Sequence, residues 1–140
     1  IRWSDIDQNR HLRHSAYYDY GATVRMKYLN GHGLTTEKME TLQIGPILFR
    51  EEAHFRREIK LEDKITVDVE IYSAKEDYSR WSLRHNFVKE DGTIAAIINM
   101  DGAWLDLVKR KLAAPPDFVV EIFKSFERSG DFAFINNSSK

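Results

Sequence analysis

One predicted helix decides the fold of this chain: Ser15-Ala16-Tyr17-Tyr18-Asp19-Tyr20-Gly21-Ala22-Thr23-Val24-Arg25-Met26-Lys27-Tyr28-Leu29-Asn30-Gly31. Large side chains recur every three or four residues along one of its faces, at Tyr17, Tyr20, Val24 and Tyr28. Ser15 suits the N-cap position, Asp19 adds a negative charge in the first turn, and Asn30-Gly31 supplies a stop. Gly21 lies on the same face, and we expect it to permit the close approach of another backbone.

Beyond this helix, the spacing of apolar residues predicts a sheet. After Gly45-Pro46, apolar and polar residues alternate, which is typical of strands with one buried face. The alternation predicts three long strands, over residues 47–59, 61–71 and 81–87. Asp91-Gly92 is typical of a tight hairpin turn. Residues 94–98 are apolar on both faces and are predicted as a central strand that extends toward Leu107.

The two ends of the chain are predicted separately. Ile1 to Ser4 is expected to be the end of a strand, with leading residues or a processed targeting segment before it. Pro115-Pro116 breaks the chain, and a short helix with Phe118, Ile122 and Phe126 on one face is predicted over 117–128. The domain therefore comprises residues 1–116, with 117–140 as its C-terminal short helix and flexible tail.

These elements predict an α+β fold in which an antiparallel sheet wraps around one long central helix. The apolar stripe of the helix faces the apolar side of the sheet. The open edges of such a sheet need cover, so we expect a homodimer or homotetramer.

Composition limits the possible functions. The 140 residues include 21 basic and 22 acidic side chains, so no overall field draws the protein to nucleic acid or to an anionic membrane. The absence of cysteine excludes disulfides and thiolate metal sites. No apolar run reaches the length of a membrane-spanning helix. We expect a cytoplasmic protein.

The chemistry is predicted in the loop that leads into the helix, Trp3-Ser4-Asp5-Ile6-Asp7-Gln8-Asn9-Arg10-His11-Leu12-Arg13-His14-Ser15-Ala16-Tyr17-Tyr18. This loop brings two carboxylates, two imidazoles and two guanidinium groups together at a helix start. A loop that only connects elements does not need titratable groups of opposite sign held so close.

The loop and the order of elements resemble the hotdog-fold acyl-CoA thioesterases of the 4-hydroxybenzoyl-CoA thioesterase and YbgC-like type. Ser4-Asp5-Ile6-Asp7, followed by residues 11–17, resembles the D-x-D loop of that family and its early helix aromatic. Residues 52–65 resemble its strand, polar turn and following strand. The resemblance covers residues 1–116. It implies a hotdog fold and hydrolysis of acyl-CoA or acyl-carrier thioesters, with no cofactor beyond the coenzyme A of the substrate.

The resemblance also implies site residues. Asp7 matches the catalytic carboxylate, as general base or nucleophile, and His14 matches a histidine that some members carry before the helix. The family commonly has glycine where Arg10 stands, so this arginine is expected to alter the turn or to reach the phosphates of the carrier. The remaining substrate-binding candidates are the residues at the helix start, Ser15, Ala16 and Tyr17, and two arginines suited to phosphates, Arg56 and Arg80.

Each assignment has a structural alternative. Asp7 would instead accept hydrogen bonds from loop amides, and His14 would be solvated before the helix. We expect Asp5 to shape the turn and His11 to bind a neighbouring carboxylate. A metal site formed by these four residues matches no standard spacing. Cross-strand ion pairs would explain most of the arginines.

At the level of function, the alternatives are a non-catalytic acyl-thioester binding protein of the same fold and a dehydratase of that fold.

Overall fold

The computed structural model describes residues 1–135, so the predicted tail over 136–140 lies outside the described residues. Its elements, in chain order, are a 3₁₀ helix η1 (Trp3–Asp5), α1 (His14–Gly31), α2 (Thr36–Leu42), β1 (Ile44–Phe55), β2 (Ile65–Val67), β3 (Glu70–Ala74), β4 (Arg80–Lys89), β5 (Ile94–Asp106), β6 (Lys111–Leu112), α3 (Asp117–Ser125) and β7 (Glu127–Phe134).

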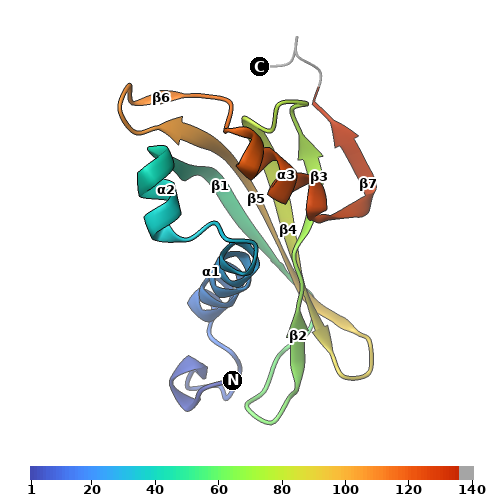
Figure 1. The fold of residues 1–140 in the computed structure, drawn as a ribbon. Coiled ribbons are helices and arrows are strands. Elements are labelled where there is room, and N and C mark those ends of the chain that lie inside the picture. Colours follow the sequence, from blue (N-terminus) through green and yellow to red (C-terminus); the bar gives the residue numbers. More distant parts are fainter. Residues whose placement is uncertain (136–140) are drawn as a thin grey trace.

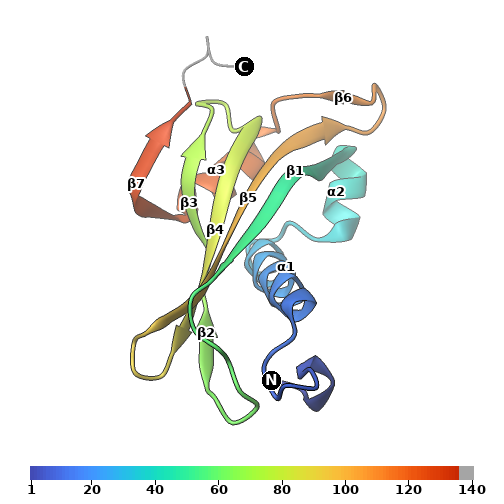
Figure 2. The same cartoon turned by 180° about the vertical axis from the view of Figure 1, so that it is seen from behind.

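A single sheet curves around α1, as predicted (Figure 1). Its strand order is β1-β5-β4-β3-β7, with β2 paired to β4 and β6 paired to β5. Seen from behind, the long strands β1, β5 and β4 run next to one another, and α1 lies beside them (Figure 2). The predicted central strand is confirmed, because β5 runs between β1 and β4. The hairpin at Asp91-Gly92 is also confirmed, with Gly92 at a φ of +89°.

The strand predicted over 61–71 is wrong as one element, because it is interrupted at Asp68 between β2 and β3. The carbonyl oxygen of Asp68 accepts a hydrogen bond from His85 Nδ1, at 2.7 Å. Its carboxylate takes over as the acceptor for the backbone amide of Asn86, at 2.6 Å. Because the Asp68 carbonyl bonds the buried His85 side chain, it does not pair with the neighbouring strand, and the regular ladder of backbone hydrogen bonds is interrupted there.

Gly21 permits a close approach, but of a side chain and not of a backbone as predicted. A Cβ at this position would lie 2.9 Å from Cδ2 of His85. The His85 side chain is fully buried between α1 and β4, where Nε2 lies 3.1 Å from Nη1 of Arg25. Arg25 in turn lies 3.6 Å from a carboxylate oxygen of Glu51 on β1. A chain of polar contacts thus joins the middle of α1 to strands β4 and β1.

Two predictions at the ends of the chain are wrong. Residues 3–5 form η1 and not a strand, and the chain after α3 forms β7 over Glu127–Phe134. β7 pairs in parallel with β3, so the sheet is mixed. The predicted helix α3 is confirmed but ends at Ser125. Its buried side chains are Val119, Ile122 and Phe123, whereas Phe118 is exposed.

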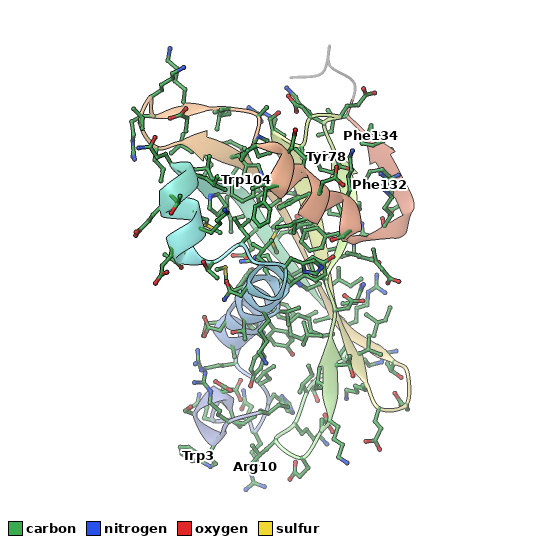
Figure 3. The ribbon with its side chains drawn as sticks, viewed as in Figure 1. Trp3, Arg10, Tyr78, Trp104, Phe132 and Phe134 are labelled. Atoms are coloured by element: carbon green, nitrogen blue, oxygen red, sulfur yellow. The ribbon has the colours of Figure 1, made fainter. Side chains whose placement is uncertain are left out.

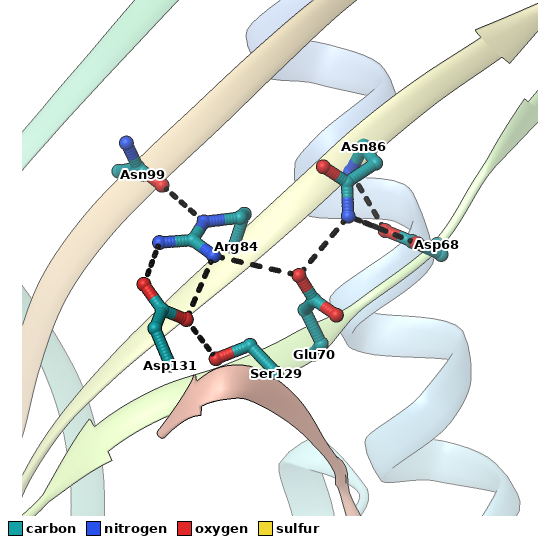
Figure 4. A network of polar contacts seen from close by, with 7 residues as sticks. All are labelled: Asp68, Glu70, Arg84, Asn86, Asn99, Ser129 and Asp131. Carbon is teal, nitrogen blue, oxygen red and sulfur yellow. Dashed lines mark hydrogen bonds and ion pairs between the residues drawn. The ribbon is translucent and has the colours of Figure 1, made fainter. Parts of the chain in front are cut away.

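Polar contacts on the outer face of the sheet attach β7 (Figure 4). Arg84 on β4 donates from Nη1 and Nη2 to the two carboxylate oxygens of Asp131, at 3.2 and 3.3 Å. Its Nε donates to Asn99 on β5, at 2.9 Å. Ser129 and Arg84, in that order, hold the pKa of Asp131 down at about 2. The Arg84 side chain is therefore engaged within the sheet.

Candidate active site

The loop before α1 is a small hairpin fixed against the chain that follows β1. Asp7 N donates to the carbonyl of His11, at 2.8 Å, and Leu12 N donates to the carbonyl of Ile59, at 2.7 Å. Single bridges pair Ile6 with Leu12 and His11 with Lys60. The two segments that resembled the thioesterase family, far apart in sequence, are therefore adjacent.

Arg10 occupies the turn at the tip of this hairpin with a φ of +66°, in the left-handed region that favours glycine. Its amide donates to the carbonyl of Asp7, at 3.0 Å, which closes the turn. The side chains of Arg10 and Trp3 point away from the body of the protein (Figure 3). The arginine thus keeps the backbone turn, and its side chain lies outside the pocket described below.

Asp5 shapes the loop, as expected. Its carboxylate is fully buried and accepts hydrogen bonds from Arg2 Nη2, at 2.9 Å, and from the hydroxyl of Tyr20 on α1. The Arg2 guanidinium holds the pKa of Asp5 well below its usual range. Arg13 Nη2 lies 3.5 Å from the same carboxylate. Asp5 is therefore a fixed anion that ties the loop to the helix.

Asp7 uses its two carboxylate oxygens differently. Its Oδ1 accepts from the backbone amides of Asn9, at 2.8 Å, and His11, at 3.1 Å. This is the structural role considered above. Its Oδ2 accepts no hydrogen bond from residues 1–135. The carboxylate is therefore held in place by one oxygen while the other stays available.

Asp7 lines a pocket of about 410 Å³, called here the loop pocket. The pocket lies between the loop, the start of α1 and the chain leaving β1, and its walls are Asp7, Asn9, His11, Leu12, His14, Tyr17, Phe55, Arg56, Arg57 and Glu58. The structure thus brings together four predicted site residues: Asp7, His14, Tyr17 and Arg56.

Tyr17 forms the inner wall of the loop pocket. Burial and, to a lesser extent, the negative charge of Asp7 raise the pKa of Tyr17 to about 12. The phenol therefore stays protonated at neutral pH and is a hydrogen-bond donor near the carboxylate.

His14 is held by an aromatic contact that the sequence did not indicate. Its ring stacks on Phe55 at the end of β1, with centroids 4.2 Å apart and planes 17° apart. Tyr17 meets the same phenyl ring edge-on, at 4.9 Å. The sequence pattern places Phe55 in the strand predicted over 47–59 and gives it no role in the site. Its contact with His14 depends on the course of β1 past the start of α1.

The N-terminus of α1 has no side-chain cap. The helix begins at His14 with Arg13 as its N-cap, so the predicted N-cap at Ser15 is wrong. An arginine has no acceptor to offer the first amides. Its guanidinium instead donates to the carbonyl of Ser4, at 3.1 Å, and contacts the hydroxyl of Ser15. Ala16 N donates to the carbonyl of Arg13, at 3.1 Å, whereas the amides of His14 and Ser15 have no acceptor within residues 1–135. Ala16, a predicted site residue, has its side chain in the core.

The arginines of the site come from one segment. Arg56 and Arg57 follow β1, and both of their backbone amides donate to the carbonyl of Ala95. His11 binds Glu58, at 3.2 Å, as expected for a carboxylate partner. Arg80 lies elsewhere: it pairs with Ala103, while Phe55 pairs with Ala96, so about 23 Å of strand separates them. Its guanidinium lies over Phe49.

The four side chains of the alternative metal site have separate partners. Asp5 binds Arg2, Asp7 binds loop amides, His11 binds Glu58 and His14 stacks on Phe55. Within residues 1–135, no three His, Asp or Glu side chains are grouped as metal ligands.

The fold is similar to several solved structures. A Staphylococcus aureus protein solved in complex with CoA is 24% identical, with a TM-score of 0.79 over 97% of this chain and 84% of that chain. A gentisyl-coenzyme A thioesterase is 18% identical, with a TM-score of 0.74 over 89% and 96%. A 1,4-dihydroxy-2-naphthoyl-CoA thioesterase from Synechocystis is 13% identical, with a TM-score of 0.79 over 89% and 91%. These likenesses establish the hotdog fold.

Among curated proteins, no sequence matches the chain. In the part of the chain that the structure describes, no helix has the length and apolar character needed to cross a bilayer.

The family model of the thioesterase-like superfamily matches residues 1–123. With the fold and the loop pocket, this match shows that the chain belongs to the thioesterase-like superfamily.

Proposed function

We propose that the protein hydrolyses acyl-CoA thioesters in the loop pocket. One observation carries the proposal: Asp7 is fixed through one oxygen by two loop amides, while its other oxygen is unpaired among the described residues in a pocket at an uncapped helix start. A purely structural Asp would not require the adjoining pocket. Thioester hydrolysis needs both a basic or nucleophilic oxygen and donors for the developing oxyanion.

The proposed reaction begins with the thioester carbonyl at the start of α1. Asp7 removes a proton from a water molecule as the water oxygen attacks the carbonyl carbon, or its carboxylate attacks directly and forms a mixed anhydride that a water molecule then hydrolyses. The unpaired amides of His14 and Ser15 stabilise the negative charge on the carbonyl oxygen, supported by the helix dipole. Collapse of the intermediate breaks the C–S bond. His14, held by Phe55, orients the water or delivers a proton to the departing thiolate.

Arg56 and Arg57 are the proposed partners of the coenzyme A phosphates. They lie on the wall of the loop pocket beside Glu58, whose carboxylate contacts His11. The similar structures include one solved with CoA, a gentisyl-coenzyme A thioesterase and a 1,4-dihydroxy-2-naphthoyl-CoA thioesterase. They support a CoA thioester as substrate. The placement in the 4-hydroxybenzoyl-CoA thioesterase and YbgC-like branch rests on the resemblance of the loop alone. An acyl-carrier thioester presents the same phosphopantetheine arm.

We also propose that two copies associate through the edge of β1. This strand pairs only with β5 in the described chain, and its side chains Leu48, Phe49 and Phe55 are 44%, 51% and 43% exposed. An open apolar edge favours pairing with a second chain. Arg80, which contacts Phe49, would then approach the partner's site and not its own. Sedimentation equilibrium measures the stoichiometry, and a monomer at working concentrations would contradict the proposal.

The experiment is thiol release from short, long and aromatic acyl-CoA thioesters by the parent protein and Asp7→Asn. Asparagine keeps the oxygen that accepts from Asn9 and His11 but removes the base. The rate should fall by roughly 10²- to 10⁴-fold, while the melting temperature stays close to that of the parent. Asp19→Asn is the matched control, because it removes the same charge from an exposed position on α1 outside the pocket.

Each outcome has a definite meaning. Hydrolysis that survives in Asp7→Asn would overturn the assignment of Asp7. A parent protein that binds acyl-CoA without releasing thiol would favour the acyl-thioester binding protein. Hydration of an enoyl thioester would favour the dehydratase.

A further inference from the structure

The hairpin that joins β5 to β6 lies at the opposite end of the sheet from the loop pocket (Figure 1). On β5, Asp106 lies beside this hairpin, whereas Ala96 pairs with Phe55 of the loop pocket. The stretch of β5 between them spans roughly 30 Å. Residues 106–112 are called here the basic hairpin, and the proposed hydrolysis does not use them.

The backbone of the basic hairpin is fixed by its own hydrogen bonds. One carboxylate oxygen of Asp106 accepts from the amides of Val108 and Lys109, at 2.9 and 3.0 Å. The carbonyl of Asp106 accepts from the amide of Arg110, at 2.8 Å. The tip therefore has a defined backbone, and the only carboxylate of the basic hairpin is bound to turn amides.

The residues of the turn are not those that a tight turn favours. The turn consists of Leu107, Val108, Lys109 and Arg110. Gly, Asn, Asp and Ser are the usual residues of such turns. Arg110 has a φ of +56°, in the left-handed region that favours glycine. Turn chemistry therefore does not explain the choice of these side chains.

Three consecutive cations, Lys109, Arg110 and Lys111, are exposed on the basic hairpin. None of them forms an ion pair within residues 1–135, and the carboxylates of Glu37 and Glu40 on α2 do not pair with them. The formal net charge of the whole chain is −1, so this concentration of positive charge is local. The hairpin therefore offers cations to an anionic partner.

Aliphatic side chains are exposed on both sides of the cations. Leu107, Val108 and Leu112 are 37%, 64% and 42% exposed. Single exposed apolar residues are normal on a protein surface, whereas a group of them on one hairpin marks a contact surface. The basic hairpin thus combines positive charge with apolar side chains that the described chain leaves uncovered.

We propose that the basic hairpin docks on the surface of an anionic lipid bilayer. The cations bind the phosphates of the lipid headgroups, and Val108 enters the boundary between headgroups and acyl chains. The phosphates of a nucleic acid or of free coenzyme A would attract the same cations, but they offer no apolar layer to Val108 and Leu112. Because the chain as a whole is nearly neutral, the contact depends on the basic hairpin and not on a long-range field.

The test is co-sedimentation of the protein with phosphatidylcholine vesicles that contain about 30% phosphatidylglycerol, compared with vesicles of phosphatidylcholine alone. The protein should bind the anionic vesicles at least about 10-fold more tightly at about 0.1 M salt. Raising the salt to about 0.5 M should remove most of this difference, because salt screens exposed charges. Equal binding to both kinds of vesicle, or binding to neither, would overturn the proposal.

Variants separate the charges from the apolar contact. The triple variant Lys109→Gln, Arg110→Gln, Lys111→Gln should weaken binding to the anionic vesicles roughly 100-fold, since each cation near the surface contributes about a 5-fold factor. Val108→Ser keeps every charge and should weaken the same binding about 10-fold. Full binding by the triple variant would contradict the proposal.

The matched control removes the same charge from exposed positions outside the basic hairpin: Lys27 on α1, Lys64 before β2 and Lys124 on α3. Joint replacement of these lysines by glutamine should change the binding by less than about 3-fold, because distant exposed charges are screened. An equal loss in both triple variants would mean that net charge alone drives the binding, and it would overturn the assignment to the basic hairpin.

A fluorescent label gives a second measurement at the tip itself. The chain has no cysteine, so Val108→Cys accepts a single environment-sensitive fluorophore. Its emission should shift to the blue with anionic vesicles, because the label enters the apolar boundary. Glu90→Cys is the matched position, since the Glu90 side chain is 74% exposed in the hairpin at the other end of β5. No shift at position 108, or an equal shift at both positions, would overturn the proposal.

Two further outcomes would identify a different partner. Binding of a single-stranded oligonucleotide that the triple variant of the basic hairpin loses, without binding of vesicles, would assign the cations to nucleic acid. The same result with free coenzyme A would assign them to its phosphates. Either would overturn the docking on a bilayer. No measurement here uses thioester hydrolysis, so this proposal and the proposed function fail independently.

Discussion

The two cavities beside α1 differ in how their polarity arises. At its N-terminus, the helix itself supplies free amides, and a loop of titratable residues closes the loop pocket. Toward its C-terminus, side chains of α1 and aromatic residues of the sheet and of α3 line a second cavity of about 160 Å³, with Arg25 as its charged residue. One helix therefore borders a pocket of titratable residues at one end and a largely apolar cavity at the other. Between them lies His85, packed against Gly21.

The largest effect is expected at Gly102 on β5, which packs against Trp81 on the wall of the second cavity. A Cβ there would lie 2.4 Å from Cη2 of Trp81 and 2.8 Å from the carbonyl oxygen of Ile47. Because the ring is buried and the carbonyl is backbone, Gly102→Ala should lower the free energy of unfolding by about 3 kcal/mol, measured by urea denaturation.

Gly130→Ala on β7 is the matched control. A Cβ there meets nothing within 4 Å, so stability should change by less than about 0.5 kcal/mol. Equal stability of the two variants would show that the Trp81 ring can move away from β5 without loss of packing energy, and that this wall of the second cavity is not rigid.

An intermediate effect on stability is expected from the titration of His85, which lies between the two cavities. Burial lowers the pKa of this imidazole to about 4. The unfolded chain, with its usual pKa near 6.5, therefore binds more protons below neutral pH, and stability falls as the pH falls. Between pH 7 and pH 4.5 this single group should remove about 2 kcal/mol from the free energy of unfolding.

The measurement is urea denaturation across that pH range in the parent protein and in His85→Gln, which cannot titrate. Over this range the variant should lose about 2 kcal/mol less than the parent. The carboxyl groups whose pKa is lowered, among them Asp5 and Glu52, act in the same direction below about pH 5, and both proteins share that part of the decline. A decline of the same size in His85→Gln would assign the pH dependence to other groups.

The smallest effect is expected inside the loop pocket at Phe55. Its ring stacks on His14, so Phe55→Leu should loosen the imidazole and lower kcat for the best acyl-CoA substrate by about 5-fold, with little change in stability. Phe49→Leu is the matched control on the same strand, because Phe49 contacts Arg80 and lies outside the pocket. An equal loss in both variants would point to a general effect of β1.

Several features could be predicted because they depend on nearby residues. The helix over 15–31, the hairpin at Asp91-Gly92 and the central strand follow from apolar spacing and turn chemistry. The loop of Asp5, Asp7 and His14 could be identified from its titratable residues and its position before a helix. The resemblance to thioesterases narrowed the choice of the reactive carboxylate to Asp7, an assignment that stays a prediction.

Other features depend on contacts that no local pattern records. The interruption at Asp68 follows from the needs of His85, which is 17 residues away. β7 forms because β3 has an open edge at which a chain returning from α3 can pair. Phe55 and Glu58 join the loop pocket only because His11 bridges to Lys60.

The sequence by itself determined the central helix, the sheet around it and the loop that carries Asp7, because apolar periodicity, glycine turns and charge placement act over a few residues. Tertiary structure alone decided which oxygen of Asp7 is free, which ring holds His14 and where the donors of Trp81 and Trp104 are buried. These depend on the register between distant strands, in which a shift of one residue turns every side chain to the opposite face of the sheet.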